Sequence, residues 1–344
     1  MTNASVMGIP SCFTDHSLFG FRDASSIHVN KLLKLVLCDV GHIICVSNTS
    51  KENTVLRASL DPRKVSVIPN AIDSSQFLPL SSRPSPSINS SSSATGRVII
   101  VVVSRLTYRK GVDLLVGLIP IVCAQFPQVD FVIGGDGPKR VALEDMIERH
   151  QLQDRVEMLG SLPHSEVPGV LNRGHIFLNC SLTEAFCIAI VEAASCGLLA
   201  VSTAVGGVPE VLPADMVELG EPSVQAMAQA VARAIVRVPL VDPQSFHRRV
   251  SRMYNWDNIA SRIELIYHRI LRADNPPFRD RLLRFSECGI FAGKIWCLVV
   301  VFFFFTLKLC EYLQPYQTIE PAIDWPRHPP SPRSSSSSSS SSAT

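Results

Sequence analysis

Residues 97–111 read RVIIVVVSRLTYRKG, and this stretch decides the fold class. Six consecutive β-branched residues at 98–103 predict a strand that is covered on both faces, as in the centre of a parallel sheet. A helix is expected at 111–126, where an apolar segment ends near Pro127. The basic turn at 104–111 lies between the two. The pattern is that of a β–α unit in an α/β protein.

The same alternation continues for another hundred residues. Strands that alternate with helices of 10 to 15 residues indicate a doubly wound Rossmann-like domain. We expect that domain to span 97–245. The further strands are expected at 129–134, 155–159, 175–179 and 198–202, and the further helices at 138–150 and 184–196.

The segments on either side are less regular. Short strands at 43–46 and 65–70 predict a partial N-terminal Rossmann-like domain over 1–78, followed by a Ser/Pro-rich linker at 79–96. An amphipathic helix at 245–273, with Trp256 near its middle, forms most of a helical segment at 246–275. The Ser-rich end, 311–344, is expected to be disordered.

Residues 289–310 form an apolar stretch that is long enough to cross a bilayer. The alternatives are a buried core helix and a peripheral hydrophobic tail. Arg279, Arg281, Arg284 and Lys294 precede or begin it, so the positive-inside rule puts the large domain in the cytosol. A hydrophobic fraction of 46% with only 18% charged residues agrees with such a segment.

The overall charge and the cysteines exclude some classes of function. A formal net charge of +2 over 344 residues gives no basic signal for nucleic-acid binding. The ten cysteines include no C-x-x-C pair and no Cys/His ladder with zinc spacing. We therefore expect no structural zinc and no nucleic-acid partner.

Two turns at the carboxyl ends of predicted strands could hold a phosphate. Arg105 and Lys110 lie five residues apart at the start of a helix, where two cations and the helix dipole could neutralise a diphosphate leaving group. A solvated basic turn is the alternative. Gly134 and Gly135 would let the backbone approach a ligand closely, although any tight βα turn has this appearance.

The segment TEAFCIAIVEAASCG at 183–197 is the most informative one. Glu184 and Glu192 stand eight positions apart with apolar residues between them, so on one helix both would lie near one face. Two carboxylates can accept hydrogen bonds from a sugar and from a ribose. The alternative is a helix-start carboxylate plus an ion-paired glutamate. A buried glutamate without a role is costly, which favours binding.

A fourth segment, FTDHSLFGF at 13–21, places His16 in a polar cluster between aromatic residues. By itself a single histidine is more often structural. Together, however, the four segments resemble retaining glycosyltransferases of the GT-B fold, family four. The segments FTDHSLFGF, ICVS and TSKENTVLR resemble, within it, the family of catalytic subunits of glycosylphosphatidylinositol N-acetylglucosaminyltransferase (PIG-A type).

The resemblance implies a role for each candidate residue. Arg105 and Lys110 would bind the donor diphosphate, and His16 would face the donor sugar from the N-terminal domain. Glu184 would contact the transferred sugar and Glu192 the ribose of UDP. Backbone amides of Ala185 and Phe186 would lie near the phosphates. Gly134 and Gly135 complete the substrate-binding set. The family needs no metal and no cofactor.

The resemblance also implies substrates, partners and a location. The donor would be UDP-N-acetylglucosamine and the acceptor phosphatidylinositol, in the first step of GPI-anchor biosynthesis, with retention of configuration. Other subunits of a membrane complex would be partners, and the chain would cross the endoplasmic reticulum membrane once with its catalytic domain on the cytoplasmic face.

The N-terminal domain is shorter than the family implies, so the chain is expected to be N-terminally truncated. A catalytically inactive truncated form, with a nucleotide-sugar-binding or scaffolding role, is the first alternative. A glycosyltransferase for another lipid or a soluble acceptor is the second.

Overall fold

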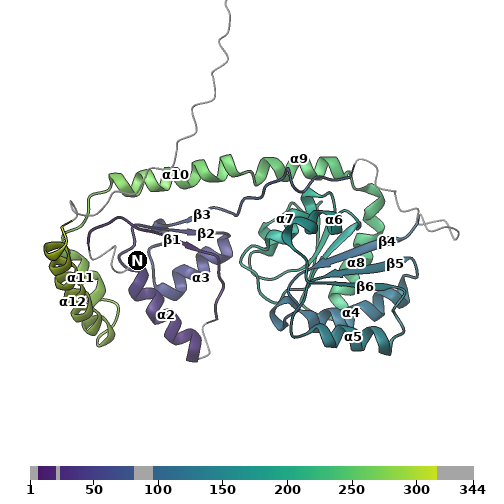
Figure 1. Cartoon of the computed structure of the whole chain (residues 1–344), viewed down its shortest axis with the longest axis horizontal. Coiled ribbons are helices and arrows are strands. Elements are labelled where there is room, and N and C mark those ends of the chain that lie inside the picture. Colours follow the sequence, from purple (N-terminus) through teal and green to yellow (C-terminus); the bar gives the residue numbers. More distant parts are fainter. Residues whose placement is uncertain (1–6, 21–23, 81–95, 316–344) are drawn as a thin grey trace, which may run out of the picture.

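The computed structural model describes residues 7–20, 24–80 and 96–315. Most of the expected linker at 79–96 and of the expected Ser-rich tail at 311–344 lies outside these residues. The described chain forms two α/β domains joined by a long helical segment that runs along both of them (Figure 1). Each domain contains a parallel sheet, one of three strands and one of six.

The larger domain has the strand order β6-β5-β4-β7-β8-β9. Counted from β4 this is the order 3-2-1-4-5-6 of a doubly wound dinucleotide-type fold. The expected Rossmann-like sheet is therefore confirmed, and β4 is its central strand. The strands are β4 (Val98–Val103), β5 (Val129–Gly134), β6 (Val156–Gly160), β7 (Ile176–Asn179), β8 (Leu199–Thr203) and β9 (Val217–Gly220).

Helices cover both faces of this sheet, which explains why its strands read as continuous apolar runs. Ile100 and Val101, adjacent in β4, have no solvent exposure, and the core extends from them into the helices on each side. The helices of this domain are α4 (Val112–Gln125), α5 (Arg140–Arg149), α6 (Val167–Leu171), α7 (Ile188–Ser195) and α8 (Val224–Arg237), with 3₁₀ turns at η2 (Tyr108–Lys110), η3 (His164–Glu166), η4 (Val208–Glu210) and η5 (Val238–Leu240).

The smaller domain is a three-layer sandwich around the sheet β1-β2-β3. Alternate residues of β2 point to opposite sides: Ile43 packs with Leu37 and Ala58 from α2 and α3, whereas Ile44 packs with Ile259 and Ile266 from α10. The elements are β1 (Cys12–Asp15), α2 (Ala24–Leu37), β2 (His42–Cys45), α3 (Asn48–Ala58), η1 (Pro62–Lys64) and β3 (Val65–Val67).

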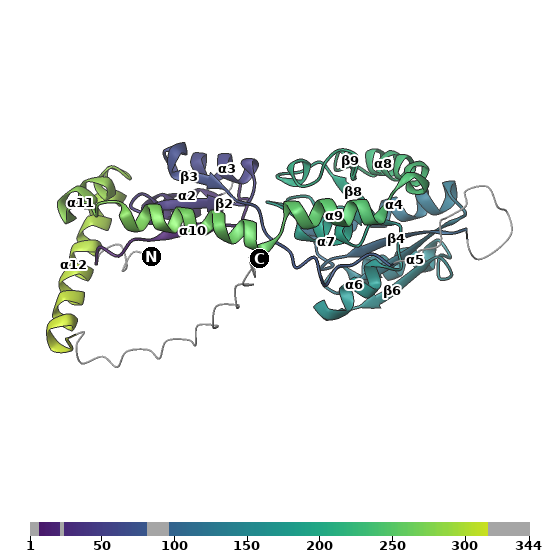
Figure 2. The same cartoon turned by 90° about the horizontal axis from the view of Figure 1, so that it is seen from above.

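The expected single helix at 245–273 is wrong in one respect, because two helices lie there: α9 (Pro243–Met253) and α10 (Trp256–Arg272). Asn255 starts the second one, since its side chain accepts a hydrogen bond from Asn258 N at 2.7 Å. Trp256 is thus the first residue of α10. α9 packs on α7 of the larger domain, while α10 crosses to the smaller domain (Figure 2).

The chain continues into a helical hairpin, α11 (Phe278–Ser286) and α12 (Ala292–Leu313). α12 has 22 residues, a mean hydropathy of 1.9 over its apolar window and only 11% of that window buried. Its length and composition suffice for a membrane span. α12 is the C-terminal apolar helix that was expected at 289–310, shifted by three residues.

Candidate active site

A cleft lies where the two domains meet, at the point where the strand order of the larger sheet reverses. The chain leaves β4 toward one edge of the sheet and β7 toward the other, which opens a crevice beyond their carboxyl ends. The cleft has a volume of about 530 Å³. Five of the sequence-predicted residues line it, namely His16, Arg105, Lys110, Glu184 and Ala185.

Lys110 and Glu184 form an ion pair in this cleft. Ser181 Oγ lies 2.8 Å from Glu184 Oε1 and 2.8 Å from Asn179 Oδ1, so Glu184 is also held by its own loop. Both charged side chains retain some exposure, 28% for Lys110 and 14% for Glu184. An incoming diphosphate can therefore compete for the ammonium group, because phosphate oxygens accept charge-assisted hydrogen bonds as a carboxylate does.

Gly111 brings the two loops of the cleft together. Its φ of 70° is left-handed, and a Cβ there would lie 1.8 Å from the carbonyl oxygen of Cys180. Leu182 N also donates to Arg109 O at 2.9 Å. The basic turn after β4 is thereby fixed against the loop after β7, which places Lys110 beside Glu184.

Glu192 is not part of this cleft lining. It lies in α7, is 9% exposed, and has His164 Nε2 at 3.3 Å from its carboxylate. Burial raises the pKa of Glu192, and the neighbouring His164 partly offsets that rise. The rings of Phe77 and His164 pack edge to face, with centroids 5.8 Å apart. This second carboxylate is thus a nearly buried acceptor beside an imidazole.

The expectation that Glu184 and Glu192 share one helix is wrong. α7 begins at Ile188, and the residue before it, Cys187, has a left-handed φ of 69° that ends the preceding loop. Glu184 belongs to that loop and not to the helix. The two carboxylates are therefore placed by different elements, and helical periodicity does not relate them.

Three further predicted site residues, Gly134, Gly135 and Phe186, pack closely against their neighbours. A Cβ on Gly134 would lie 2.3 Å from Leu162 Cδ1, and one on Gly135 would lie 1.8 Å from the carbonyl oxygen of Ser104. Phe186 is 5% exposed and packs edge-on against Tyr254. None of these three belongs to the lining of the interdomain cleft, and each packs against its surroundings instead.

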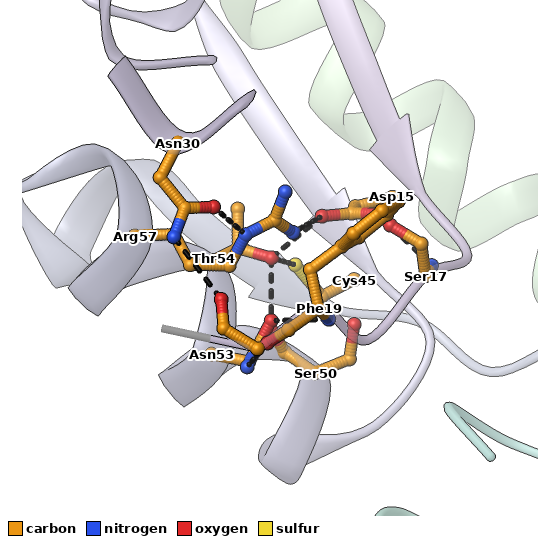
Figure 3. Close-up of polar contacts among 10 residues, drawn as sticks. Asp15, Ser17, Phe19, Asn30, Cys45, Ser50, Asn53, Thr54 and Arg57 are labelled. Carbon is orange, nitrogen blue, oxygen red and sulfur yellow. Dashed lines mark hydrogen bonds and ion pairs between the residues drawn. The ribbon is translucent and has the colours of Figure 1, made fainter. Parts of the chain in front are cut away.

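His16 enters the cleft from the loop after β1, and a buried polar cluster holds that loop (Figure 3). Asp15 is 3% exposed; its carboxylate accepts from Thr54 Oγ1 at 2.7 Å and lies 3.7 Å from the Arg57 guanidinium. Asp15 also accepts from the backbone amide of Ser17 at 2.9 Å. Arg57 stacks over the Phe19 ring at 4.5 Å. His16 thus lies between Asp15 and Phe19, and side chains of α3 contact both of these residues.

His164 and Ser181 are not among the site residues predicted from sequence. Ser181 stands three residues before Glu184, which is a local signal that could have been used. No such signal exists for His164, because 28 residues separate it from Glu192 and only the fold brings them together.

The side chains bear on two further kinds of site, a cysteine nucleophile and a metal centre. Burial raises the pKa of the thiols of Cys180 and Cys187 to about 12, so neither is a thiolate nucleophile at neutral pH. Within residues 7–20, 24–80 and 96–315, no three His, Cys, Asp or Glu side chains gather as a metal site would require.

Two family models together match most of the chain. Residues 2–76 match the model of "Glycosyltransferase Family 4", and residues 86–237 match that of "Glycosyl transferases group 1". The boundary between them coincides with the boundary between the two sheets.

Solved structures share the fold. A protein from Anabaena, HepE, in complex with UDP superposes with a TM-score of 0.65 at 21% identity, covering 78% of this chain and 77% of that one. The pneumococcal O-GlcNAc transferase GtfA, in complex with UDP and GlcNAc, gives a TM-score of 0.61 at 18% identity over 78% of this chain and 54% of its own. These likenesses establish the GT-B fold.

Sequence relatives are much closer. The chain is 54% identical to a phosphatidylinositol N-acetylglucosaminyltransferase subunit of Arabidopsis thaliana, over 94% of this chain and 70% of that protein. It is 52% identical to the corresponding human protein, over 94% of this chain and 65% of that protein. It therefore spans about two thirds of the length of these relatives. The chain belongs to this family of phosphatidylinositol N-acetylglucosaminyltransferase subunits, within glycosyltransferase family 4.

Proposed function

We propose that this chain transfers N-acetylglucosamine from UDP-N-acetylglucosamine to phosphatidylinositol with retention of configuration, as the first step of GPI-anchor biosynthesis. The observation that supports this best is the interdomain cleft, where His16 of one domain faces Arg105, Lys110 and Glu184 of the other. Its position at the switch point of the larger sheet is where an α/β protein binds a nucleotide.

The charges in the cleft match the charge that develops in such a transfer. The bond from the sugar to the β-phosphate breaks and UDP leaves, so negative charge grows on the diphosphate. Arg105 and Lys110 would supply two cations for that charge. The acceptor hydroxyl attacks from the same face, and its proton passes to the departing phosphate oxygen. No metal or cofactor is required for this step.

The carboxylates would select the rest of the donor. Glu184 would release Lys110 to the diphosphate and accept a hydrogen bond from the sugar, while His16 approaches the sugar from the opposite wall. Glu192 would hold the ribose hydroxyls from its nearly buried position. The amides of Ala185 and Phe186, and the turn at Gly134 and Gly135, would approach the phosphates.

We further propose that α12 anchors the chain in the endoplasmic reticulum membrane as a single span, with both α/β domains in the cytosol and other subunits of the complex as partners. Leu298, Phe302 and Phe305 are each at least 66% exposed, as a lipid-facing helix requires. Lys308, near the end of α12, forms an ion pair with Glu311 and could snorkel to an interface.

The hairpin constrains how α12 enters the bilayer. Phe278 of α11 stacks on Phe304 of α12 at 4.4 Å, while Arg281 and Arg284 of α11 bind Asp39 of the smaller domain. Because those arginines remain with the soluble domain, full insertion requires α12 to part from α11. Gly289, with a φ of 153°, lies between the two helices and is the natural hinge.

The test is transfer of labelled N-acetylglucosamine from UDP to phosphatidylinositol in membranes of cells that lack their own catalytic subunit. The control is the double variant Arg105→Ala, Lys110→Ala. Transfer that is lost in the control would support the proposal. Retained UDP binding without transfer would instead favour an inactive donor-binding or scaffolding role, and transfer to a different lipid in an acceptor panel would reassign the substrate.

A further inference from the structure

The amino end of α3 is held by the opposite domain through one carboxylate. Glu210, in η4 of the larger domain, accepts from the backbone amides of Asn48 at 2.7 Å and Thr49 at 2.9 Å. It also accepts from the Asn48 side-chain amide at 2.7 Å and from Thr49 Oγ1 at 2.8 Å. A carboxylate at a helix N-terminus satisfies orphan amide groups and matches the helix dipole.

Further contacts around Glu210 show that the facing surfaces of the two domains are complementary. Ser47, the N-cap of α3, donates to the carbonyl oxygen of Ala185 at 2.7 Å, and Thr49 Oγ1 lies 3.2 Å from that of Gly206. A Cβ on Gly207 would lie 2.5 Å from Ser47 Oγ and 2.1 Å from the Ala185 carbonyl oxygen. The glycine is required for the domains to come this close.

The carboxyl-side half of the same helix holds the loop that carries His16. Thr54 and Arg57 hold Asp15 on one side of His16, and Asn53 Nδ2 donates to the Phe19 carbonyl oxygen at 3.0 Å on the other (Figure 3). α3 therefore connects the larger domain to the loop that carries His16. The same end of the larger domain carries Glu184, whose carbonyl oxygen accepts from Gly207 N at 3.0 Å.

We propose that Glu210 is a positioning residue that couples domain closure to the placement of His16 through α3. When the Glu210 carboxylate docks on the amino end of α3, His16 is brought to the cleft wall opposite Glu184. Glu210 is exposed on the surface, so water can replace its partners and the contact can open for substrate exchange. Only the kinetic test of this role of Glu210 rests on the proposed transfer reaction.

The first test needs no activity. Hydrogen exchange is measured on the full chain and on Glu210→Ala and Glu210→Gln, with Glu221→Gln as the control that changes charge in the same domain. The probes are the amides of Ser17 and Phe19, whose acceptors are Asp15 and Asn53. We expect exchange at both to accelerate about tenfold or more in the Ala variant, the fold-change that one charge-assisted hydrogen bond is worth. Unchanged exchange at both probes in both Glu210 variants would overturn the proposal.

The second test separates positioning from general loosening. Glu210→Ala and His16→Ala are combined in a double-mutant cycle on kcat. If Glu210 acts through His16, its substitution has little further effect once His16 is gone. Independent, additive losses would overturn the proposal. A wild-type chain without transfer activity would refute the proposed function, whereas the exchange experiment would still decide the role of Glu210.

Discussion

Replacing Glu192 with glutamine separates binding from stability at one position. The glutamine keeps a carbonyl acceptor for a ribose hydroxyl but loses the charge. A hydrogen bond to a charged group is worth about 1.5–3 kcal/mol and a neutral one about 0.5–1.5 kcal/mol. The midpoints of these ranges differ by about 1.25 kcal/mol, which predicts a roughly eightfold larger Kd for UDP. Titration calorimetry on the detergent-solubilised chain measures it directly.

The same carboxylate has a raised pKa, and the sign of its effect on stability follows. The folded state binds the Glu192 proton more tightly than the unfolded state does, so the free energy of unfolding falls as the pH rises from the unfolded pKa through the folded one. At neutral pH Glu192→Gln should therefore be more stable than the wild type while binding UDP less well. In the wild type, UDP affinity should also fall as acid protonates Glu192.

The matched control is Glu157→Gln. Glu157 is exposed, pairs with Arg173 and lies on β6, outside the interdomain cleft lining. It should leave UDP affinity unchanged. A Glu192→Gln variant that binds UDP within about twofold of wild type, or whose stability falls at neutral pH, would refute the assignment of Glu192 to the ribose.

The same contacts give three more predictions. Arg105→Ala should lower kcat by about 10²–10³-fold if it stabilises the leaving diphosphate, and a wild-type rate in the transfer assay would remove it from the mechanism. Arg57→Leu should cost about 3 kcal/mol in urea unfolding, because it leaves the buried Asp15 carboxylate without a counter-ion; recovery in the double variant with Asp15→Asn would identify the lost charge as the cause. Removal of residues 289–344 should release the chain from carbonate-washed membranes, and retention would argue against α12 as the anchor.

The larger domain was predictable because its strands are buried on both faces and therefore read as apolar runs. Val98–Val103, and the strand that ends at Gly134, were recognised from composition alone. The short strand β9 and the strand β1 were not. β1 has only four residues, two of them polar, and its burial depends on pairing with β2, which lies about thirty residues further along the chain.

The break between α9 and α10 was missed for a different reason. Both helices are amphipathic and only two residues separate them, so a sequence-based prediction joins them into one. Only the tertiary structure shows that α9 packs on α7 whereas Ile259 and Ile266 of α10 pack on the smaller sheet. The Asn255 cap is a local sign of the break, but the sequence does not show that the two helices pack on different domains.

In the candidate active site, too, the positions of Glu184 and Glu192 depend on the fold. Sequence spacing singled out Glu184 and Glu192 for a reason that the structure contradicts, since Glu184 lies in a loop ahead of α7. The position of Glu184 in the loop after β7 still favours a binding role, because ligands collect at that end of an α/β sheet. The contacts that fix each carboxylate, Lys110 for Glu184 and His164 for Glu192, cross long stretches of sequence. Glu210, whose partners lie more than 160 residues away in the other domain, was beyond any local pattern. Candidate residues at the ends of strands can therefore be named from sequence, whereas contacts between domains require the fold.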